Sequence, residues 1–128
     1  MQLKLLPEVF GILKLTPSLA LPHPFPDWLS AASVFFVAQT EDEFSVMCPQ
    51  QMIPAGVEYS ANWRCLRAHG NLAFDEVGVV ARLSQPLTEA GLSLFLVSTH
   101  DRDYVFVQQD DLEKALVIYR SKGFTPLV

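Results

Sequence analysis

The sequence has few basic residues. Nine lysines and arginines stand against fourteen aspartates and glutamates in 128 residues, which gives a formal net charge of −5. Proteins that bind nucleic acid neutralise phosphate groups with a concentrated basic face, whereas the basic residues of this chain are scattered along it. We therefore expect no nucleic-acid partner, because this charge is typical of an ordinary hydrated surface.

Cysteine is also scarce. Cys48 and Cys65 each lie in an apolar, strand-like run, and they form no CxxC motif. A disulfide scaffold or a cysteine metal site would need more thiols or a recognised spacing. We expect two buried, reduced thiols.

Long apolar runs and familiar catalytic motifs are absent. The first fifteen residues are rich in leucine, but Pro7, Glu8 and Lys14 interrupt them and no small-residue cleavage site follows. We expect a cytoplasmic protein with neither a signal peptide nor a membrane span. The sequence contains no GxSxG, P-loop or HExxH motif, so we expect no enzyme and no cofactor.

The sequence does contain an internal repeat. Residues 34–47 (VFFVAQTEDEFSVM) and residues 94–107 (LFLVSTHDRDYVFV) place apolar, polar and acidic positions in the same order, at an offset of sixty residues. In each copy an apolar run leads into a polar turn, and an acid, Glu43 or Asp103, precedes an aromatic residue and a second apolar run. The pattern predicts the same β-hairpin twice, with the turn acid carried into the second strand.

The second copy has helical patterns on both sides of its hairpin. Asp110 and Glu113 follow it with capping-box spacing, and Gly123 ends the helix that they begin. With a strand-like run at 63–68 and the final FTPLV as a short strand, the order is strand, helix, strand, strand, helix, strand, which is ferredoxin-like. A helix before the hairpin is predicted by apolar residues at three- and four-residue intervals, namely Val77, Val80, Leu83 and Leu87. Gly91 is expected to end this helix.

The first copy follows the same plan in a shorter form. Three prolines at 22–26 precede DWLSAA, so its first helix is at most two turns long, and its last helix is missing or reduced to QQMIPAG. Residues 3–6 are available as an extra strand that folds back on residues 10–15. We expect an α+β fold of two units with antiparallel sheets and helices on one face, an abbreviated unit in 1–62 and a complete one in 63–128, sharing one core.

Residues 63–116 resemble the ACT-domain family, in particular small tandem-ACT proteins related to the animal arginine sensor. The distinctive pieces are FDEVGVVARLSQPLTEAGLSLF, the STxxxDYVFV hairpin and, in the first half, FFVAQTEDEFSVMCP. They occur in the same order as in the family and cover nearly the whole chain from about Phe10 onward. The resemblance implies a regulatory module, similar to those of aspartokinases, that binds a free amino acid at an interface between ACT units and has no chemistry of its own.

The resemblance also implies a ligand site. The cationic part of the ligand would bind Asp103. Residues at the start of a helix would border the pocket, and residues at the start of a strand in a facing ACT unit would supply backbone contacts. Because the arginine sensor has glycine where this chain has Ala73, arginine itself is not assumed. The facing unit implies a homodimer, and the output would pass to a regulatory protein partner. The residues carried over are Ala73, Glu76, Val77, Gly78, Ser93, Leu94, Thr99, His100 and Asp103.

The residues themselves are compatible with such a site. We expect Gly78 in the first turn of a helix, where glycine costs about 0.5–1 kcal/mol relative to alanine. A bare helix N-terminus presents N–H groups that suit a carboxylate, although close packing of the helix on the sheet would explain Gly78 equally well. Asp75 is expected as the N-cap, and Glu76 is favoured there by the helix dipole. Asp103 begins a strand, so the sheet backbone would hold its carboxylate in place.

Two other functions stay open. Two histidines with two carboxylates would suit a divalent transition metal, although the spacing of the histidines matches no recognised metal motif. Those residues are His69, His100, Asp101 and Asp103. A purely structural interaction module is the other alternative, since two open units leave sheet edges that can pair with other chains.

Overall fold

Contacts between residues divide the chain into two compact units. The computed structural model describes residues 1–15, 26–68 and 77–128. One unit, the C-unit, consists of Met1–Pro7 and Arg64–Val128, and the other, the N-unit, consists of Glu8–Trp63. The expected division into ACT units at 62/63 stays a prediction, since this grouping concerns contacts alone and assigns the first seven residues to the C-unit.

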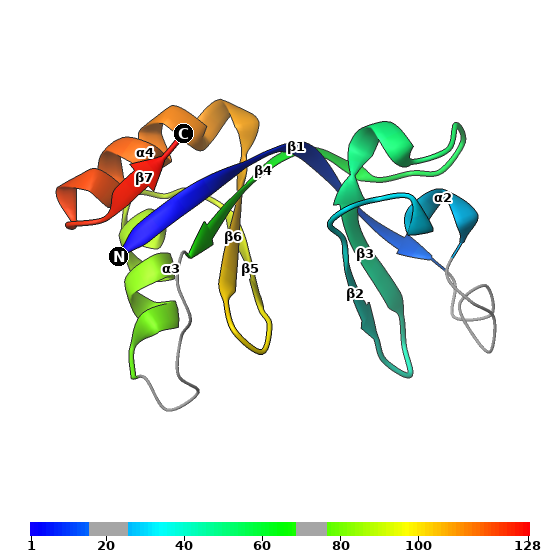
Figure 1. Cartoon of the computed structure of the whole chain (residues 1–128), viewed down its shortest axis with the longest axis horizontal. Helices are drawn as coiled ribbons and strands as arrows, with labels where there is room; N and C mark the ends of the chain where they lie inside the picture. The colour runs from blue at the N-terminus through cyan, green and yellow to red at the C-terminus, as the bar shows by residue number, and fades with distance from the viewer. Residues whose placement is uncertain (16–25, 69–76) are drawn as a thin grey trace. The chain divides into compact units, whose positions relative to one another are not determined.

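Strand β1 (Gln2–Leu15) is a single strand of fourteen residues. The expectation that residues 3–6 fold back on residues 10–15 is therefore wrong. The residue before a proline is restricted to extended conformations, so the Leu6–Pro7 step continues a strand without bending it. Residues Gln2–Lys4 instead pair in parallel with β7 (Thr125–Leu127), and Figure 1 shows the two chain ends side by side there.

The C-unit is an α+β sandwich with the expected ferredoxin-like order. Its strand order is β7-β1-β4-β6-β5, and β5 and β6 form an antiparallel hairpin. One core cluster contains buried side chains from both helices and from the strands, so the helices cover one face of the sheet. The elements are β4 (Ser60–Ala68), α3 (Val79–Glu89), β5 (Leu94–Ser98), β6 (Asp103–Gln108) and α4 (Leu112–Ser121), with a 3₁₀ turn at Gln109–Asp111.

The helices end as expected but begin differently. Gly91 and Gly123 both have positive φ, and after α4 the N–H of Phe124 donates to the carbonyl of Tyr119, 3.0 Å away, which closes a Schellman-type turn. The predicted capping box is wrong, because the N-cap of α4 is Asp111 and no side chain caps it. An intervening 3₁₀ turn moves the helix start past Asp110.

The apolar stripe predicted for α3 is half correct. Leu83 and Leu87 are completely buried in the core, whereas Val77 and Val80 are exposed and Val79 is buried in their place. The reason is that α3 begins at Val79, so Val77 precedes the helix and does not follow its periodicity.

The N-unit is the abbreviated version that the sequence predicts. Helix α2 (Asp27–Ser30) has four residues, and a 3₁₀ turn at Gln50–Met52 stands where the last helix was expected to be reduced. Strands β2 (Phe36–Gln39) and β3 (Phe44–Pro49) form a hairpin, and β3 pairs with β1. The core of this unit comprises Leu13, Leu29, Phe44, Val46 and Cys48.

Both cysteines are free and buried, as predicted. Burial raises the pKa of the Cys48 thiol to about 11. A thiol with that pKa is protonated at neutral pH and therefore a poor nucleophile. None of the helices in residues 1–15, 26–68 and 77–128 has the length and apolar character that a membrane span requires.

Gly11 in β1 allows a close approach inside the N-unit. A Cβ atom added there would lie 2.6 Å from Cδ1 of Ile53 and 2.8 Å from Cδ2 of Tyr59. We expect Gly11→Ala to lower the free energy of unfolding by about 1–3 kcal/mol, the usual cost of overpacking, as measured by urea denaturation. Lys14→Ala on the same strand is the control and should change it by less than about 0.5 kcal/mol. Equal stability of the two variants would contradict this packing.

Candidate functional site

The two hairpins have the same turn. In the C-unit, Ser98 pairs with Asp103 across a four-residue loop that begins with Thr99, whose N–H donates to the carbonyl of Arg102 at 2.8 Å. In the N-unit, Gln39 pairs with Phe44 across a loop that begins with Thr40, whose N–H donates to the carbonyl of Glu43 at 2.9 Å. Both predicted hairpins are confirmed.

The register of the repeat differs from the predicted one by a single residue. Since Thr40 begins one loop and Thr99 the other, the structural offset is 99 − 40 = 59 rather than sixty. Glu43 therefore corresponds to Arg102 and remains in its turn, and Asp103 corresponds to Phe44. The idea that both copies carry an acid into the second strand is wrong, because only the C-unit does so.

Asp103 is a buried acid at the start of β6. Its side chain is 7% exposed, and no other charged residue in the described part of the chain is buried. Because side chains alternate along a strand, Asp103 shares a face with Val105 and Val107, which pack in the core under the helices. Asp103 therefore faces the helix layer.

Among the described residues, one side chain donates a hydrogen bond to this carboxylate. The Ser98 hydroxyl donates to Oδ1 of Asp103 at 2.5 Å. A carboxylate can accept about four hydrogen bonds, and burying a charge is unfavourable unless partners compensate it. Phe44 occupies the matching position in the N-unit core, so an apolar side chain can close the same hairpin. Folding does not require an acid at this position, which makes Asp103 a candidate for binding a cationic group.

Gly78 is the N-cap of α3 and does not lie in its first turn, which corrects the sequence expectation. Its φ of 84° is in the left-handed region, which glycine adopts without the steric cost that other residues meet. A Cβ atom added to Gly78 would meet nothing within 4 Å, so close packing on the sheet does not explain the glycine. Among the residues that the structure describes, no side chain caps this end of α3, and the first turn of the helix contains no acid.

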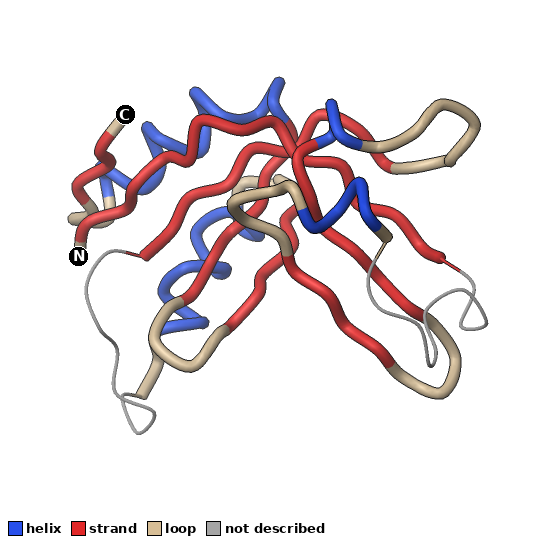
Figure 2. Tube along the Cα trace, turned by 45° about the vertical axis from the view of Figure 1, so that its right-hand side comes forward, coloured by secondary structure: helices blue, strands red, loops and turns tan. Residues whose placement is uncertain are grey.

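The start of α3 and the turn between β5 and β6 lie at the same end of the C-unit. Figures 1 and 2 show them together in both orientations. Val79, the first residue of α3, belongs to the same core cluster as Val105. The structure thus places Gly78, at the start of a helix, and Asp103, at the start of a strand, at the same end of the C-unit.

Ser93 and Leu94 lie elsewhere. Leu94 pairs with Val107 at one end of the hairpin, and Asp103 pairs with Ser98 at the other. At about 3.4 Å per residue, five residues of strand separate Ser93 from Ser98 by roughly 17 Å. A small ligand on Asp103 cannot also contact Ser93 of the same chain, which agrees with the expectation that Ser93 and Leu94 act from a facing unit.

The remaining site residues are exposed or outside the described residues. Ala73, Asp75 and Glu76 fall in the segment 69–76, which is not described. Val77 is 92% exposed. The side chain of His100 is 80% exposed, and its Nδ1 lies 2.7 Å from Oδ1 of Asp101. Thr99 is exposed in the turn.

The metal alternative receives no support from the described residues. His69 lies outside them, and nowhere within 1–15, 26–68 and 77–128 do three or more histidine, cysteine, aspartate or glutamate side chains form a potential metal site.

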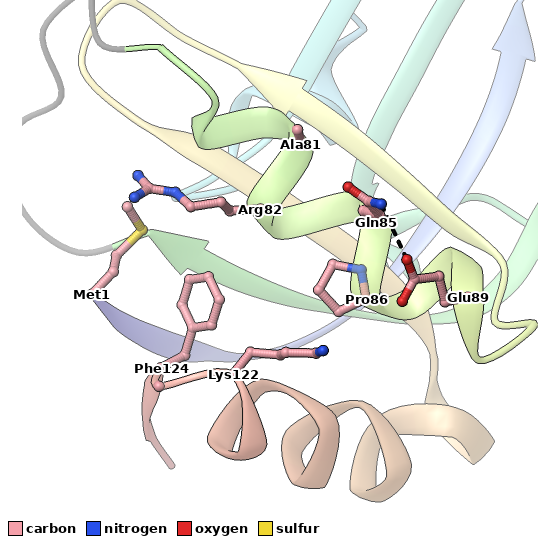
Figure 3. A pocket seen from close by; sticks show the side chains of 9 residues that line it. Met1, Ala81, Arg82, Gln85, Pro86, Glu89, Lys122 and Phe124 are labelled. Atoms are coloured by element: carbon pink, nitrogen blue, oxygen red, sulfur yellow. Dashed lines mark hydrogen bonds between the residues drawn. The ribbon is translucent and has the colours of Figure 1, made fainter.

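A groove on the C-unit was missed by sequence reasoning. It has a volume of about 460 Å³ and lies between the polar face of α3 and the residues that follow α4. Figure 3 shows its lining. The spacing of Arg82, Gln85, Pro86 and Glu89 indicates a shared helix face, but the contribution of Lys122 and Phe124 from the other end of the chain has no sequence signal.

Comparison with known proteins identifies the family. The sequence model of the ACT domain matches residues 58–118. Residues 58–118 of the chain belong to the ACT-domain family. A solved Agobacterium tumefaciens protein is 32% identical to this ACT protein, has a TM-score of 0.87, and aligns over 98% of this chain and 91% of its own. The resemblance seen in the sequence is confirmed.

Two further proteins are similar to this chain, one in sequence and one in fold. The human cytosolic arginine sensor for mTORC1 subunit 1 is 33% identical over 61 residues. That match covers 47% of this chain and 18% of the sensor. The regulatory subunit of aspartate kinase from Thermus thermophilus shares the fold, with a TM-score of 0.61 at 13% identity over 93% of this chain and 95% of its own.

The conformation of Gly78 gives a prediction about the start of α3. We expect Gly78→Val to lower the free energy of unfolding by about 1–2 kcal/mol through the left-handed backbone, as measured by urea denaturation. Gly78→Asn is the matched variant and should cost less, because asparagine tolerates this region. If Gly78→Val is as stable as the wild type, the positive φ is not a constraint.

Proposed function

We propose that this ACT protein is a non-catalytic regulatory protein of the cytoplasm that binds a free amino acid on the C-unit. The observation that carries the proposal is the buried carboxylate of Asp103, at a hairpin position that the N-unit fills with Phe44. A buried charge of this kind costs stability unless a partner compensates it. We assign that role to the cationic group of the ligand.

The carboxylate of the ligand would bind at the start of α3. The first N–H groups of a helix carry the positive end of its dipole and have no partners within the helix, so they suit a carboxylate. The start of α3, for which the described residues provide no side-chain cap, lies at the same end of the unit as the start of β6, which carries Asp103. An anionic acceptor and a set of N–H donors at one end complement the two charges of an amino acid. Ala73, Glu76, Val77, Thr99 and His100 border the proposed site.

The site would be completed by a second copy of the chain. Ser93 and Leu94 lie too far from Asp103 to contact the same ligand within one chain, so we propose that they come from the partner in a homodimer. Strand β5 is the last strand of its sheet, and it carries Phe95, which is 46% exposed. An apolar edge strand is a surface on which another chain can pair.

The N-unit is proposed to lack a site of its own. Its hairpin has Phe44 where the C-unit has Asp103, and its α2 has only four residues, so it offers neither of the two ligand-binding groups. The proposal therefore gives one ligand per chain. Ligand binding would change association or shape, and a regulatory protein partner would read that change, as ACT units attached to aspartate kinases suggest.

The role of Asp103 is tested by ligand affinity. A thermal-shift screen against the twenty amino acids identifies the ligand, since one present at a hundred times its Kd adds about 2.7 kcal/mol of stability. Asp103→Asn should then raise the Kd in calorimetry by roughly ten- to a hundredfold, because a charge-assisted hydrogen bond contributes about 1.5–3 kcal/mol.

Asp42→Asn is the matched control. Asp42 is an exposed acid in the corresponding turn of the N-unit, so this variant makes the same change in charge and should leave the Kd unchanged. Equal effects of the two variants would indicate a general electrostatic contribution and remove Asp103 from the site. A wild-type protein that no amino acid stabilises would overturn the proposed function.

The homodimer is tested by light scattering. We expect a dimer at tens of micromolar, and Phe95→Lys should raise its dissociation constant at least tenfold by placing a charge on the edge strand. Val117→Lys, which changes a 61% exposed valine on α4, is the control and should leave the dimer intact. A monomeric wild type, with and without ligand, would exclude a site shared between chains.

A further inference from the structure

Ser98 and Asp103 form the last pair of the β5–β6 ladder, next to the turn. Leu94 and Leu96 of β5 pack against the core under the helices, and because side chains alternate along a strand, Ser98 faces the helix layer as Asp103 does. Residues directly opposite each other have Cβ atoms about 4.5–5.5 Å apart. The hydroxyl of Ser98 is therefore within reach of the carboxylate across the ladder.

The hydrogen bond within this pair makes the two carboxylate oxygens unequal. The Ser98 hydroxyl donates to Oδ1 of Asp103 at 2.5 Å. Within residues 1–15, 26–68 and 77–128, this hydroxyl is the one group that donates to the carboxylate. A carboxylate can accept about four hydrogen bonds, roughly two at each oxygen. Oδ2 therefore retains its full capacity as an acceptor, whereas Oδ1 has lost part of its own.

The described residues around the carboxylate leave a narrow approach. Leu96 and Val105 form the next pair of the ladder on the same face, and Val105 is completely buried, so apolar side chains border Asp103 on the inner side. Only 7% of Asp103 is exposed. A cation has to approach from the end of the ladder that carries the turn, and this opening favours a compact cation over a broad, planar one.

An ammonium and a guanidinium make different demands on a carboxylate. A guanidinium presents five N–H donors in a planar fork and binds most strongly when two parallel hydrogen bonds reach both carboxylate oxygens. At Asp103 the Ser98 hydroxyl competes for Oδ1, and N–H donors left without a partner in a buried site are unfavourable. An ammonium is a compact charge with three rotatable donors, so it can bind through Oδ2 alone.

We propose that the cationic subsite at Asp103 selects an ammonium over a guanidinium, and that Ser98 is the positioning residue that sets this selectivity. The inference rests on the proposed function, because it names the group that the ligand presents to Asp103. By holding Oδ1, Ser98 fixes the carboxylate and leaves Oδ2 as its main acceptor. The α-ammonium of a free amino acid, or the side-chain ammonium of a lysine-like ligand, meets this requirement, whereas the side chain of arginine does not.

The experiment uses ethylammonium and ethylguanidinium as probes, since the two carry the same apolar group and the same charge. Each is titrated at constant ionic strength into the ¹⁵N-labelled full chain, up to about 50 mM for a weak site, and the amide shifts of Ser98 and Asp103 give the Kd. We expect ethylammonium to bind at least about fivefold more tightly than ethylguanidinium, which is the factor for one ordinary hydrogen bond.

Variants of Ser98 separate a positioning role from a merely structural one. Ser98→Ala should bring the Kd values of the two probes to within about twofold of each other, because Oδ1 is then free for the second hydrogen bond of the guanidinium. Ser98→Thr keeps the hydroxyl and should preserve the selectivity. A purely structural role would weaken the binding of both probes equally and leave the ratio of their Kd values unchanged.

Ser45→Ala is the matched control. In the hairpin of the N-unit the Ser45 hydroxyl donates to Oε1 of Glu43 at 2.6 Å, so this variant removes the same kind of hydrogen bond at a position outside the proposed site. Because sites that share no contacts behave independently, both Kd values should stay within about twofold of the wild type. Asp103→Asn should abolish the shifts caused by either probe.

Two outcomes would overturn the selectivity while the proposed function stands. The first is that ethylguanidinium binds as tightly as ethylammonium, and the second is that Ser98→Ala leaves the ratio of the two Kd values unchanged. If neither probe shifts the amides of Ser98 and Asp103, the carboxylate holds no cation, and the role of Asp103 in the proposed function fails together with the selectivity.

Discussion

The hydrogen bond from the Tyr119 hydroxyl to the carbonyl of Leu83, 2.6 Å long, is the interaction on which the C-unit depends most. It joins α4 to α3 inside the core, where Tyr119 is completely buried and burial raises its pKa. A buried hydroxyl without a partner is costly, so this bond fixes which residues of the two helices face each other. The same tyrosine also packs on Phe124 and accepts its N–H. Tyr119 therefore holds the second turn of α3 through Leu83 and one wall of the groove through Phe124.

Much of the fold could be predicted because its signals are local. Alternating apolar residues predicted both hairpins, three- and four-residue spacing predicted α3 and α4, and glycines at 91 and 123 predicted their ends. The continuity of β1 could not be predicted in this way. Leu3 is buried by a core built mainly from residues after 64, and that tertiary contact decides the path of the chain where local pattern allowed a turn at Pro7.

The candidate site was predicted less completely. Asp103 was singled out from the sequence as a ligand-binding acid, which stays a prediction, and its burial and its hydrogen bond from Ser98 could be known only from the structure. The sequence repeat gave Asp103 the wrong counterpart in the N-unit. The repeat pattern paired Asp103 with Glu43, whereas the register of the two hairpins pairs it with Phe44. Gly78 shows the same limit. The residue was recognised as unfavourable inside a helix, but the left-handed conformation that explains it lies just before the helix begins.

The shared strand β1 has a consequence for how the protein is made on the ribosome. Residues Gln2–Lys4 pair with Thr125–Leu127, so the first of these strand partners emerges from the ribosome long before the second. Closing so long a loop is entropically expensive and slow, and until it closes, Leu3 has no core to enter. The N-unit can assemble its own hairpin and short helix while the rest of the chain is still being synthesised. The sheet of the C-unit, which holds Asp103, cannot be completed before β7 has been synthesised, and until then the leucines of β1 lack their core partners and can aggregate.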